Sequence, residues 1–379
     1  KMISNKIKTL RNKFLKFDID GYVIPKNDVY FSEYSSPDRL KFISNFDGSA
    51  GLAIILKDKN YLFVDGRYTI QAKFQSGKNF NIIEIHKKLP WKVLNHRIKI
   101  GYNPYCFTSL SLKRYFKNYF NLLPIYDDLI IKSKTKKINK KFYFINDNIS
   151  GENSKSKISK VLKYLHEDKS DCLFITAPEN VAWLLNLRGY DNPYSPIPNC
   201  RLILKNNGKM YLFTNKSKIK KLFKKINRLK IKLIDESRLD IFLKDLKSKK
   251  IILDRLSCSL AYENILKNKI DISIRNDPIY YMKSIKNNTE IKNFIKSHIF
   301  DGVAVVKFLS WLKGYKKNLT ELESEKKLNY FRMKNKNYLF PSFNTISASG
   351  PNGAIIHYRA NKRSNRIIKK NDIFLCDSG

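Results

Sequence analysis

Two polar residues on apolar runs, His357 and Asp377, are the residues of this sequence best suited to chemistry. Asp377 ends the run Ile373–Cys376 and is followed by Ser378 and Gly379. An unpaired carboxylate on an apolar strand is costly, and a metal ion with further carboxylates or histidines nearby would pair it. The same residue before Ser-Gly can simply open a surface turn, and the residues alone favour this plainer explanation.

His357 falls in the segment Ala354–Tyr358, which we predict to be a strand with His357 and Ile355 on one face. A histidine there can polarise a substrate carbonyl or move a proton near neutral pH. A half-buried histidine bonded to the backbone is the plainer alternative, and the strand alone favours it. The preceding Gly-Pro-Asn-Gly at 350–353 is a strong turn signal. No P-loop, GxGxxG, HExxH or GxSxG motif offers a competing chemistry.

The formal net charge of +41 is the most extreme property of the composition, with 74 basic and 33 acidic residues. Such a charge points to nucleic acid or another anionic surface. The lysines are nevertheless spread over the whole chain, and the densest run, residues 132–141, is typical of a solvated linker. No nucleic-acid-binding motif accompanies the charge, so we expect no specific nucleic-acid partner.

The length of 379 residues predicts two or three domains, each with its own core. No apolar run approaches the length that crosses a bilayer, and no signal-peptide core is present at the N-terminus. We therefore expect a cytoplasmic protein without a membrane partner.

The five cysteines are scattered and form no CxxC pair, which argues against a zinc ribbon and a disulfide framework. Cys106, Cys172 and Cys376 adjoin apolar residues and are expected to be buried thiols. Cys200 and Cys258 have polar neighbours and receive no assignment.

The hydrophobic pattern repeats a whole domain plan about 150 residues apart. Each copy predicts a helix, a strand and then a hairpin of two strands. The segment 42–48 aligns with 183–189, and its Asn and Gly are identical in the two copies. We therefore predict two related α/β domains. The strands expected are 21–25, 52–56 and 61–64 in the first copy, and 172–175, 201–204 and 210–213 in the second.

The third region begins near Lys283 with two predicted helices and two strands. After Thr289 a long amphipathic helix is expected, and Thr320–Glu323 is a capping-box signature for a second helix that ends before Pro341. The apolar stripe of the first helix is Ile291, Phe294, Ile295, Ile299, Val303, Val306 and Leu309. Two helices and two strands do not close a domain, so we expect this one to be incomplete.

Long segments of the chain resemble the Xaa-Pro aminopeptidases (aminopeptidase P). The segment 340–358 is similar to the one that leads to the substrate-binding histidine of that family, and 374–379 to the strand of its first metal-binding aspartate. The helix at 301–311 resembles the one that opens the catalytic domain. Residues 45–51, 64–68 and 182–189 resemble motifs of the two preceding domains.

The resemblance implies an α/β architecture of two related N-terminal, creatinase-like domains, at 1–135 and 145–282, followed by a pita-bread metallopeptidase domain at 283–379. It implies release of the N-terminal residue from peptides with proline second, a bond without an amide proton. Asp377 would be the first metal ligand, and His357 a catalytic histidine that binds substrate and stabilises the oxyanion. Arg67, of the Asp-Gly-Arg-Tyr motif, would contact the peptide, with a surface arginine at a helix start as the alternative.

The cofactors implied are two divalent metal ions, Mn²⁺ before Zn²⁺ or Co²⁺, which share a water that attacks the scissile carbonyl. The family pattern needs a second aspartate, a histidine and two glutamates after Asp377, and the sequence does not contain them. A single carboxylate cannot hold two metals. We therefore expect a C-terminally truncated form, inactive alone, of an enzyme that is a homodimer.

Three alternatives stay open. A prolidase or a creatinase-like hydrolase would have the same fold, but the two preceding domains and the segment before His357 favour the aminopeptidase. A non-catalytic pita-bread module for acidic partners would suit the charge but has no need of His357 and Asp377. A nucleic-acid-binding protein would be retained on DNA with a steep salt dependence.

Overall fold

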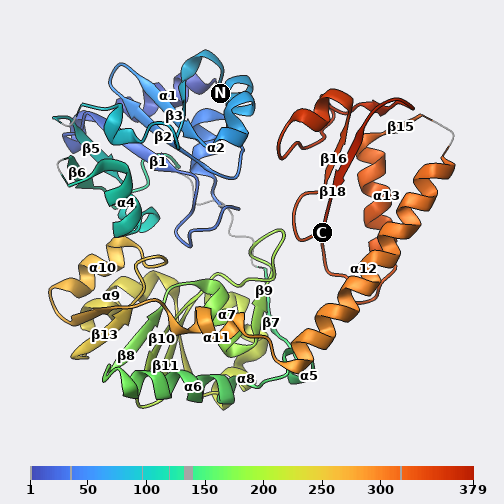
Figure 1. Ribbon diagram of the computed structural model, residues 1–379. Helices are drawn as coiled ribbons and strands as arrows, with labels where there is room; N and C mark the ends of the chain where they lie inside the picture. The colour runs from blue at the N-terminus through green and yellow to red at the C-terminus, as the bar shows by residue number, and fades with distance from the viewer. Residues whose placement is uncertain (1, 35, 96, 119, 132–139, 316–317) are drawn as a thin grey trace. The chain divides into compact units, whose positions relative to one another are not determined.

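The computed structural model describes residues 2–34, 36–95, 97–118, 120–131, 140–315 and 318–379 (Figure 1). The chain divides into two compact units. The first comprises residues 1–145, 152–192 and 197–285, and the second comprises residues 146–151, 193–196 and 286–379.

The first unit begins with a mixed six-stranded sheet in the order β4-β3-β2-β1-β5-β6. Its strands are β1 (Gly21–Pro25), β2 (Gly51–Leu56), β3 (Asn60–Val64), β4 (Asn81–Glu84), β5 (Lys99–Tyr102) and β6 (Asn121–Pro124). The accompanying helices are α1 (Ile3–Arg11), α2 (Arg39–Ser44), α3 (Thr69–Ser76) and α4 (Ser109–Phe116). Short 3₁₀ helices are η1 (Leu15–Phe17), η2 (Gly66–Tyr68), η3 (Gly77–Asn79), η4 (Pro90–Lys92) and η5 (Pro104–Cys106).

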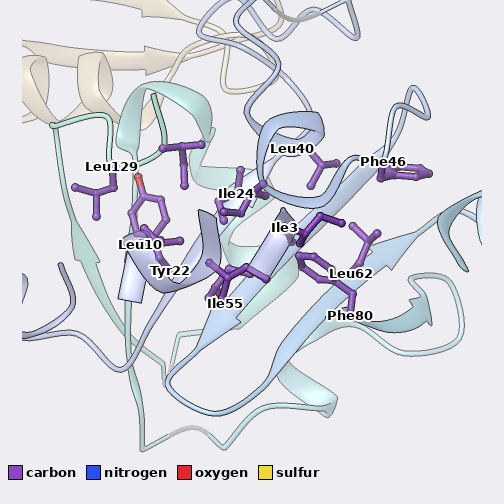
Figure 2. Close-up of a cluster of buried hydrophobic side chains, with 14 of the residues drawn as sticks. Ile3, Leu10, Tyr22, Ile24, Leu40, Phe46, Ile55, Leu62, Phe80 and Leu129 are labelled. Atoms are coloured by element: carbon purple, nitrogen blue, oxygen red, sulfur yellow. The ribbon is translucent and has the colours of Figure 1, made fainter. Parts of the chain in front are cut away.

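This sheet is buried on both faces because successive side chains point to opposite sides of a strand. Tyr22 and Ile24 of β1 enter one hydrophobic cluster, whereas Val23 between them enters another. Figure 2 shows the first cluster, where side chains of α1 and α2 pack on the strands. The labelled members are Ile3, Leu10, Tyr22, Ile24, Leu40, Phe46, Ile55, Leu62, Phe80 and Leu129.

The second sheet repeats the first in order and direction, which confirms the predicted domain repeat. Its order is β12-β11-β10-β8-β13-β14, and β8 is antiparallel to β10 and parallel to β13, as β1 is to β2 and β5. The strands are β8 (Cys172–Ile175), β10 (Arg201–Lys205), β11 (Met210–Phe213), β12 (Ile231–Ile234), β13 (Lys250–Leu253) and β14 (Asp271–Ile274). A separate pair joins β7 (Phe142–Phe144) to β9 (Leu187–Gly189).

The helices of this second sheet are α6 (Ser154–Glu167), α7 (Pro178–Leu185), α8 (Phe223–Arg228), α9 (Leu239–Asp245), α10 (Leu260–Lys267) and α11 (Pro278–Ser284). Its 3₁₀ helices are η6 (Lys216–Lys218), η7 (Lys220–Leu222) and η8 (Glu236–Arg238).

The asparagine shared by the two repeats ends a helix in each copy. Asn45 caps α2 with φ 62°, and Asn186 caps α7 with φ 51°. Asparagine enters this left-handed region more readily than most residues and is a common helix C-cap. The identity between the copies is thus explained by backbone conformation.

Arg201 links the two sheets of the first unit through a buried guanidinium. It donates to the backbone oxygen of Val29 and to Glu236, and its guanidinium carbon lies 4.2 Å from the ring centre of Tyr30. Tyr30 in turn donates to Glu236. Burying a charge is costly unless it is paired and hydrogen-bonded, so these contacts stabilise the arginine inside the unit.

The second unit is built on two helices that pack side by side, α12 (Asn288–Gly314) and α13 (Glu321–Met333) (Figure 1). A capping box begins each helix. It is formed by Asn287 and Glu290 in α12 and by Thr320 and Glu323 in α13, as predicted for α13. Two antiparallel strand pairs complete the unit, β15 (Leu319–Thr320) with β17 (Ile367–Ile368) and β16 (Ile346–Ser349) with β18 (Phe374–Asp377). A short helix, α5 (Asp147–Ser150), also belongs to it.

The apolar stripe predicted on the long helix exists, but it is exposed. Its seven residues are between 46% and 65% accessible, and the buried residues of α12 are Ala304 and Phe308. A contiguous apolar surface of this kind marks a contact face in most proteins.

Three further predictions meet different outcomes. Cys106 and Cys172 are buried as expected, but Cys376 is exposed because it lies on β18 of a two-stranded pair and not in a larger sheet. The predicted linker run is outside the described residues for 132–139. The described part of the chain holds no helix long and apolar enough to cross a membrane. The domain boundaries proposed from the sequence stay predictions.

A buried carboxylate begins the last helix of the second sheet. Asp277 caps α11, accepts from the amide nitrogen of Ile279 at 2.9 Å and from Nδ2 of Asn180 at 2.8 Å, and its own N–H donates to Asp254. Burial, aided by the nearby Asp254 charge, raises the pKa of Asp277 to about 6.

This pKa predicts a pH dependence of stability that D277N removes. Because the folded protein holds the proton more tightly than the unfolded chain, the neutral form stabilises the fold and this contribution is lost as pH rises from about 4 through about 6. We expect wild type to lose up to about 3 kcal/mol relative to D277N over that window, measured as urea unfolding at each pH. D271N, at an exposed carboxylate, is the control for the loss of one charge. Parallel pH curves for wild type and D277N would contradict the assignment.

Candidate functional site

The segment that carries His357 is not a strand, so that prediction was wrong. Residues Gly350–Ala354 form the 3₁₀ helix η9, and the chain then turns, with Tyr358 N–H donating to the oxygen of Ile355 at 3.1 Å. His357 lies in this turn with φ 55° and an exposed side chain. The physical reason is that polar side chains on both sides of His357 hydrogen-bond to one buried acceptor, and this bends the chain into a turn.

That acceptor is the carboxylate of Glu321, the first residue of α13, which is fully buried. Its Oε1 accepts from the backbone N–H of Ser349 at 2.7 Å, and its Oε2 accepts from that of Arg366 at 3.2 Å. The side-chain amide of Asn352 donates at 3.0 Å, and the hydroxyl of Tyr358 at 2.8 Å. One carboxylate therefore joins α13, β16, η9, the turn of His357 and the approach to β17.

Tyr358 fixes the turn to the interior of the unit through its side chain. Its side chain is buried directly after the exposed His357, and its hydroxyl contacts Glu321, Asn352 and the backbone oxygen of Ser364. Burial and the Glu321 carboxylate raise the pKa of Tyr358 to about 12, so the hydroxyl stays protonated and can donate.

Asp377 is the last residue of β18 and pairs with Ile346 of β16. Its side chain is exposed, and it shares one face of β18 with Leu375, as predicted, because side chains alternate along a strand. A side chain added at Gly353 of η9 would lie 4.0 Å from Cβ of Leu375. The loop that leads to His357 therefore lies, at Gly353, against the face of β18 that carries Leu375 and Asp377.

Buried Arg332 anchors the turn after Asp377. Its guanidinium binds Asp301 at 2.6 and 3.1 Å and donates to Oγ of Ser378 at 3.1 Å. A planar guanidinium paired with a carboxylate through two bonds fixes both groups in one geometry. Arg332 of α13 thus fixes the residue after β18, and Asp301 of α12 fixes Arg332 in turn.

Arg67 lies in the other unit, in η2 directly after β3. The carboxylate of Asp65 accepts from its backbone N–H at 3.0 Å and from its Nε at 2.8 Å. This hydrogen bonding lowers the pKa of Asp65 and raises that of Arg67, and the side chain stays exposed. Arg67 is thereby pre-oriented at the surface of its own unit.

The structure thus describes His357 and Asp377 in the same unit and Arg67 in the other. Among the described residues, no group of three or more His, Cys, Asp and Glu side chains could hold a metal ion. The sequence did not reveal Glu321 or Arg332. One signal for Glu321 was available in the sequence. The first turn of α13 holds two acids, Glu321 and Glu323, and because Glu323 completes the capping box, Glu321 has no capping role.

Comparisons with known proteins agree with this geometry. Residues 6–123 and 133–290 each match the Creatinase/Prolidase N-terminal domain, and residues 292–379 match metallopeptidase family M24. The fold and site therefore define a member of the creatinase and prolidase class of metallopeptidases.

Individual relatives narrow the class. The probable Xaa-Pro aminopeptidase P of Laccaria bicolor is 31% identical over 99% of this chain and 62% of its own length. The Xaa-Pro aminopeptidase ApepP of Drosophila melanogaster is 32% identical over 95% of this chain and 63% of its own length. Proteins named Xaa-Pro aminopeptidase are thus homologous to this chain over nearly its whole length, and the resemblance noted in the sequence is confirmed.

A solved structure shows the same fold. The X-prolyl aminopeptidase of Caenorhabditis elegans, described as a cytosolic enzyme with a di-nuclear active site, superposes with a TM-score of 0.91 at 23% identity. The match covers 100% of this chain and 68% of that protein. The predicted α/β fold class is confirmed, and this chain spans a little under two thirds of the length of the curated relatives above.

The buried carboxylate gives a sharp test of what holds the His357 loop. In E321Q the amide must turn an NH₂ group toward at least one donor, which leaves a buried N–H unsatisfied at a cost of about 1–3 kcal/mol. We expect faster hydrogen exchange at the amides of Ser349 and Arg366 and lower stability against urea.

E323Q is the matched control, two residues along the same turn. Glu323 is exposed, and glutamine also serves at this position of a capping box, so we expect a loss below about 0.5 kcal/mol. Equal losses in the two variants would show that Glu321 is an ordinary helix-start acid.

Proposed function

We propose that this chain is part of a metal-dependent aminopeptidase that releases the N-terminal residue from peptides with proline in second position. The observation that carries the proposal is that η9, which leads to His357, lies at Gly353 against the face of β18 that bears Leu375 and Asp377. The names of its relatives support the substrate class, and the M24 match supports metal-dependent hydrolysis.

His357 is proposed to bind substrate and to stabilise negative charge on the carbonyl oxygen. It is exposed and carried on a turn that the buried Tyr358 and Glu321 hold rigidly. A donor that is fixed before the reaction needs no rearrangement when charge develops, which is the condition for effective oxyanion stabilisation.

Asp377 is proposed as the first metal ligand. Its carboxylate is exposed at a strand end, and hard divalent ions such as Mn²⁺ prefer oxygen ligands, so the residue fits one position of such a site. The described residues do not fit a complete metal centre, because they contain no group of three or more His, Cys, Asp or Glu side chains that could hold an ion. For the whole enzyme we propose two divalent ions, with Mn²⁺ before Zn²⁺ or Co²⁺, and a water that they activate.

Arg67 is proposed to contact the peptide, because Asp65 holds its guanidinium in a defined orientation while leaving it exposed. A cytoplasmic location and a homodimeric whole protein complete the proposal. The cytosolic description of the Caenorhabditis elegans enzyme supports the location.

Because Asp377 is the single metal ligand proposed among these 379 residues, we predict that they bind metal weakly and do not turn over substrate. We expect calorimetric titration with Mn²⁺ to give at most one weak site, which D377N abolishes because it removes the carboxylate charge. Release of the first residue from an Xaa-Pro-Pro tripeptide should not exceed the background rate. Two tight Mn²⁺ sites, or turnover at an enzyme-like rate, would contradict the proposed ligand set.

Peptide binding tests the assigned roles separately from turnover. We expect the tripeptide Xaa-Pro-Pro to shift the ring signals of His357 in NMR spectra, and H357A to weaken binding at least roughly tenfold, the equivalent of one lost charge-assisted hydrogen bond. H298A, at an exposed histidine of α12, is the control. An Xaa-Pro dipeptide that binds better than the tripeptide would favour a prolidase.

A further inference from the structure

Part of the large positive charge is concentrated on one segment, residues 216–232, which we call the basic segment. Nine of its 17 residues are Lys or Arg, and no acidic residue occurs between Asp191 and Asp235. The whole chain has one acid for about two basic residues, with 33 against 74. Acid-free stretches of similar length also occur at residues 85–126 and 326–371, so the basic segment is distinguished by its density of cations and not by the missing acids.

The structure turns most of these cations outward. Seven of them are exposed, namely Lys216, Lys220, Lys221, Lys224, Arg228, Lys230 and Lys232. None of the seven forms a salt bridge with any residue that the structure describes. Lys218, in contrast, pairs with Asp191 at 2.6 Å, and Lys225 lies over the ring of Phe144 at 4.4 Å.

The arrangement of the exposed cations does not serve the fold. Lys224 and Arg228 are four residues apart on α8, where like charges face each other and lower helix stability. The segment continues into β12, which is an edge strand of the second sheet and carries exposed Lys232. Mutual repulsion of this kind is relieved when a polyanion supplies the missing negative charge.

The apolar side of the segment is already occupied. Ile219 and Ile226 are buried in the core of the second sheet, and Leu222 and Leu229 pack against the same core. A membrane-surface helix needs a free apolar face to enter the lipid, so this geometry argues against a bilayer. The exception is Phe223, which is 43% exposed among the lysines.

An exposed aromatic ring within a cationic surface is the combination that binds single-stranded nucleic acid. Lys and Arg follow the phosphates, and the ring stacks on a base of any identity. We propose that the basic segment is a binding surface for single-stranded nucleic acid, without base specificity. This proposal is independent of the peptidase function, because it concerns neither His357 nor Asp377.

The test compares two triple variants of the 379-residue chain that lose the same charge. K220Q/K221Q/K224Q removes three cations of the basic segment, whereas K8Q/K113Q/K244Q removes three exposed lysines from the separate helices α1, α4 and α9. The probe is a fluorescein-labelled oligouridine of about 16 nucleotides, titrated by anisotropy at several salt concentrations. Circular dichroism and thermal melting establish that both variants fold.

We expect the segment variant to lose binding and the control to keep it. Each phosphate contact contributes about 0.7 to the salt slope of a single strand, so the slope should fall by about 2 and the affinity at 0.1 M salt roughly a hundredfold. F223A should weaken binding by at least roughly fivefold with an unchanged slope, because stacking releases no counterions.

Three outcomes would overturn the proposal. Equal losses in the two triple variants would show that binding reflects the net charge of the whole chain. An unchanged affinity in F223A would remove the stacking role and leave an unspecific cationic surface. Tighter capture by phosphatidylcholine vesicles that contain phosphatidylserine than by oligouridine, lost in the segment variant, would assign the segment to an anionic membrane.

Discussion

The second unit depends on one buried carboxylate. Among the residues that the structure describes, no cationic side chain is bonded to Glu321, and its carboxylate is stabilised by two backbone N–H groups, one amide and one hydroxyl. A buried charge held by neutral donors is stable only while all the donors stay in place. The donors come from β16, η9, the turn of His357 and the approach to β17, so the carboxylate fixes these segments together. The position of His357 follows from that constraint and not from the rigidity of a strand.

The sequence was most informative where backbone conformation and burial act on neighbouring residues. Three of the six strands of each repeat and the capping box of α13 follow from local patterns, and the shared Asn45 and Asn186 mark a left-handed helix end. The prediction for His357 was wrong because the apolar residues around it, Ile355, Ile356 and Tyr358, are also typical of a strand. The competing effect was the attraction of Asn352 and Tyr358 to an acid more than 30 residues earlier in the chain, which no local pattern contains.

Family resemblance supplied what physical chemistry left open. From the residues alone, Asp377 was better explained by a turn, and the structure leaves it exposed at the end of a two-stranded pair. What distinguishes it is its surroundings, since Arg332 fixes the next residue and η9 lies against its face of the strand. Both features involve groups remote in sequence, so they were visible only after folding. The same holds for the contrast between a buried Tyr358 and an exposed His357.

The basic segment and the candidate site belong to different units of the chain, and this separates their roles. The basic segment lies on the edge of the second sheet in the first unit, whereas His357 and Asp377 lie in the second unit. A cationic surface that served peptide hydrolysis would be expected among the residues that bind the peptide, where it could attract an acidic substrate. Exposed cations also follow His357 directly in the chain, namely Arg359, Lys362, Arg363, Lys369 and Lys370, so the unit of the candidate site has positive charge of its own. Electrostatic attraction by the basic segment is therefore better explained by a separate polyanionic partner than by the peptide substrate.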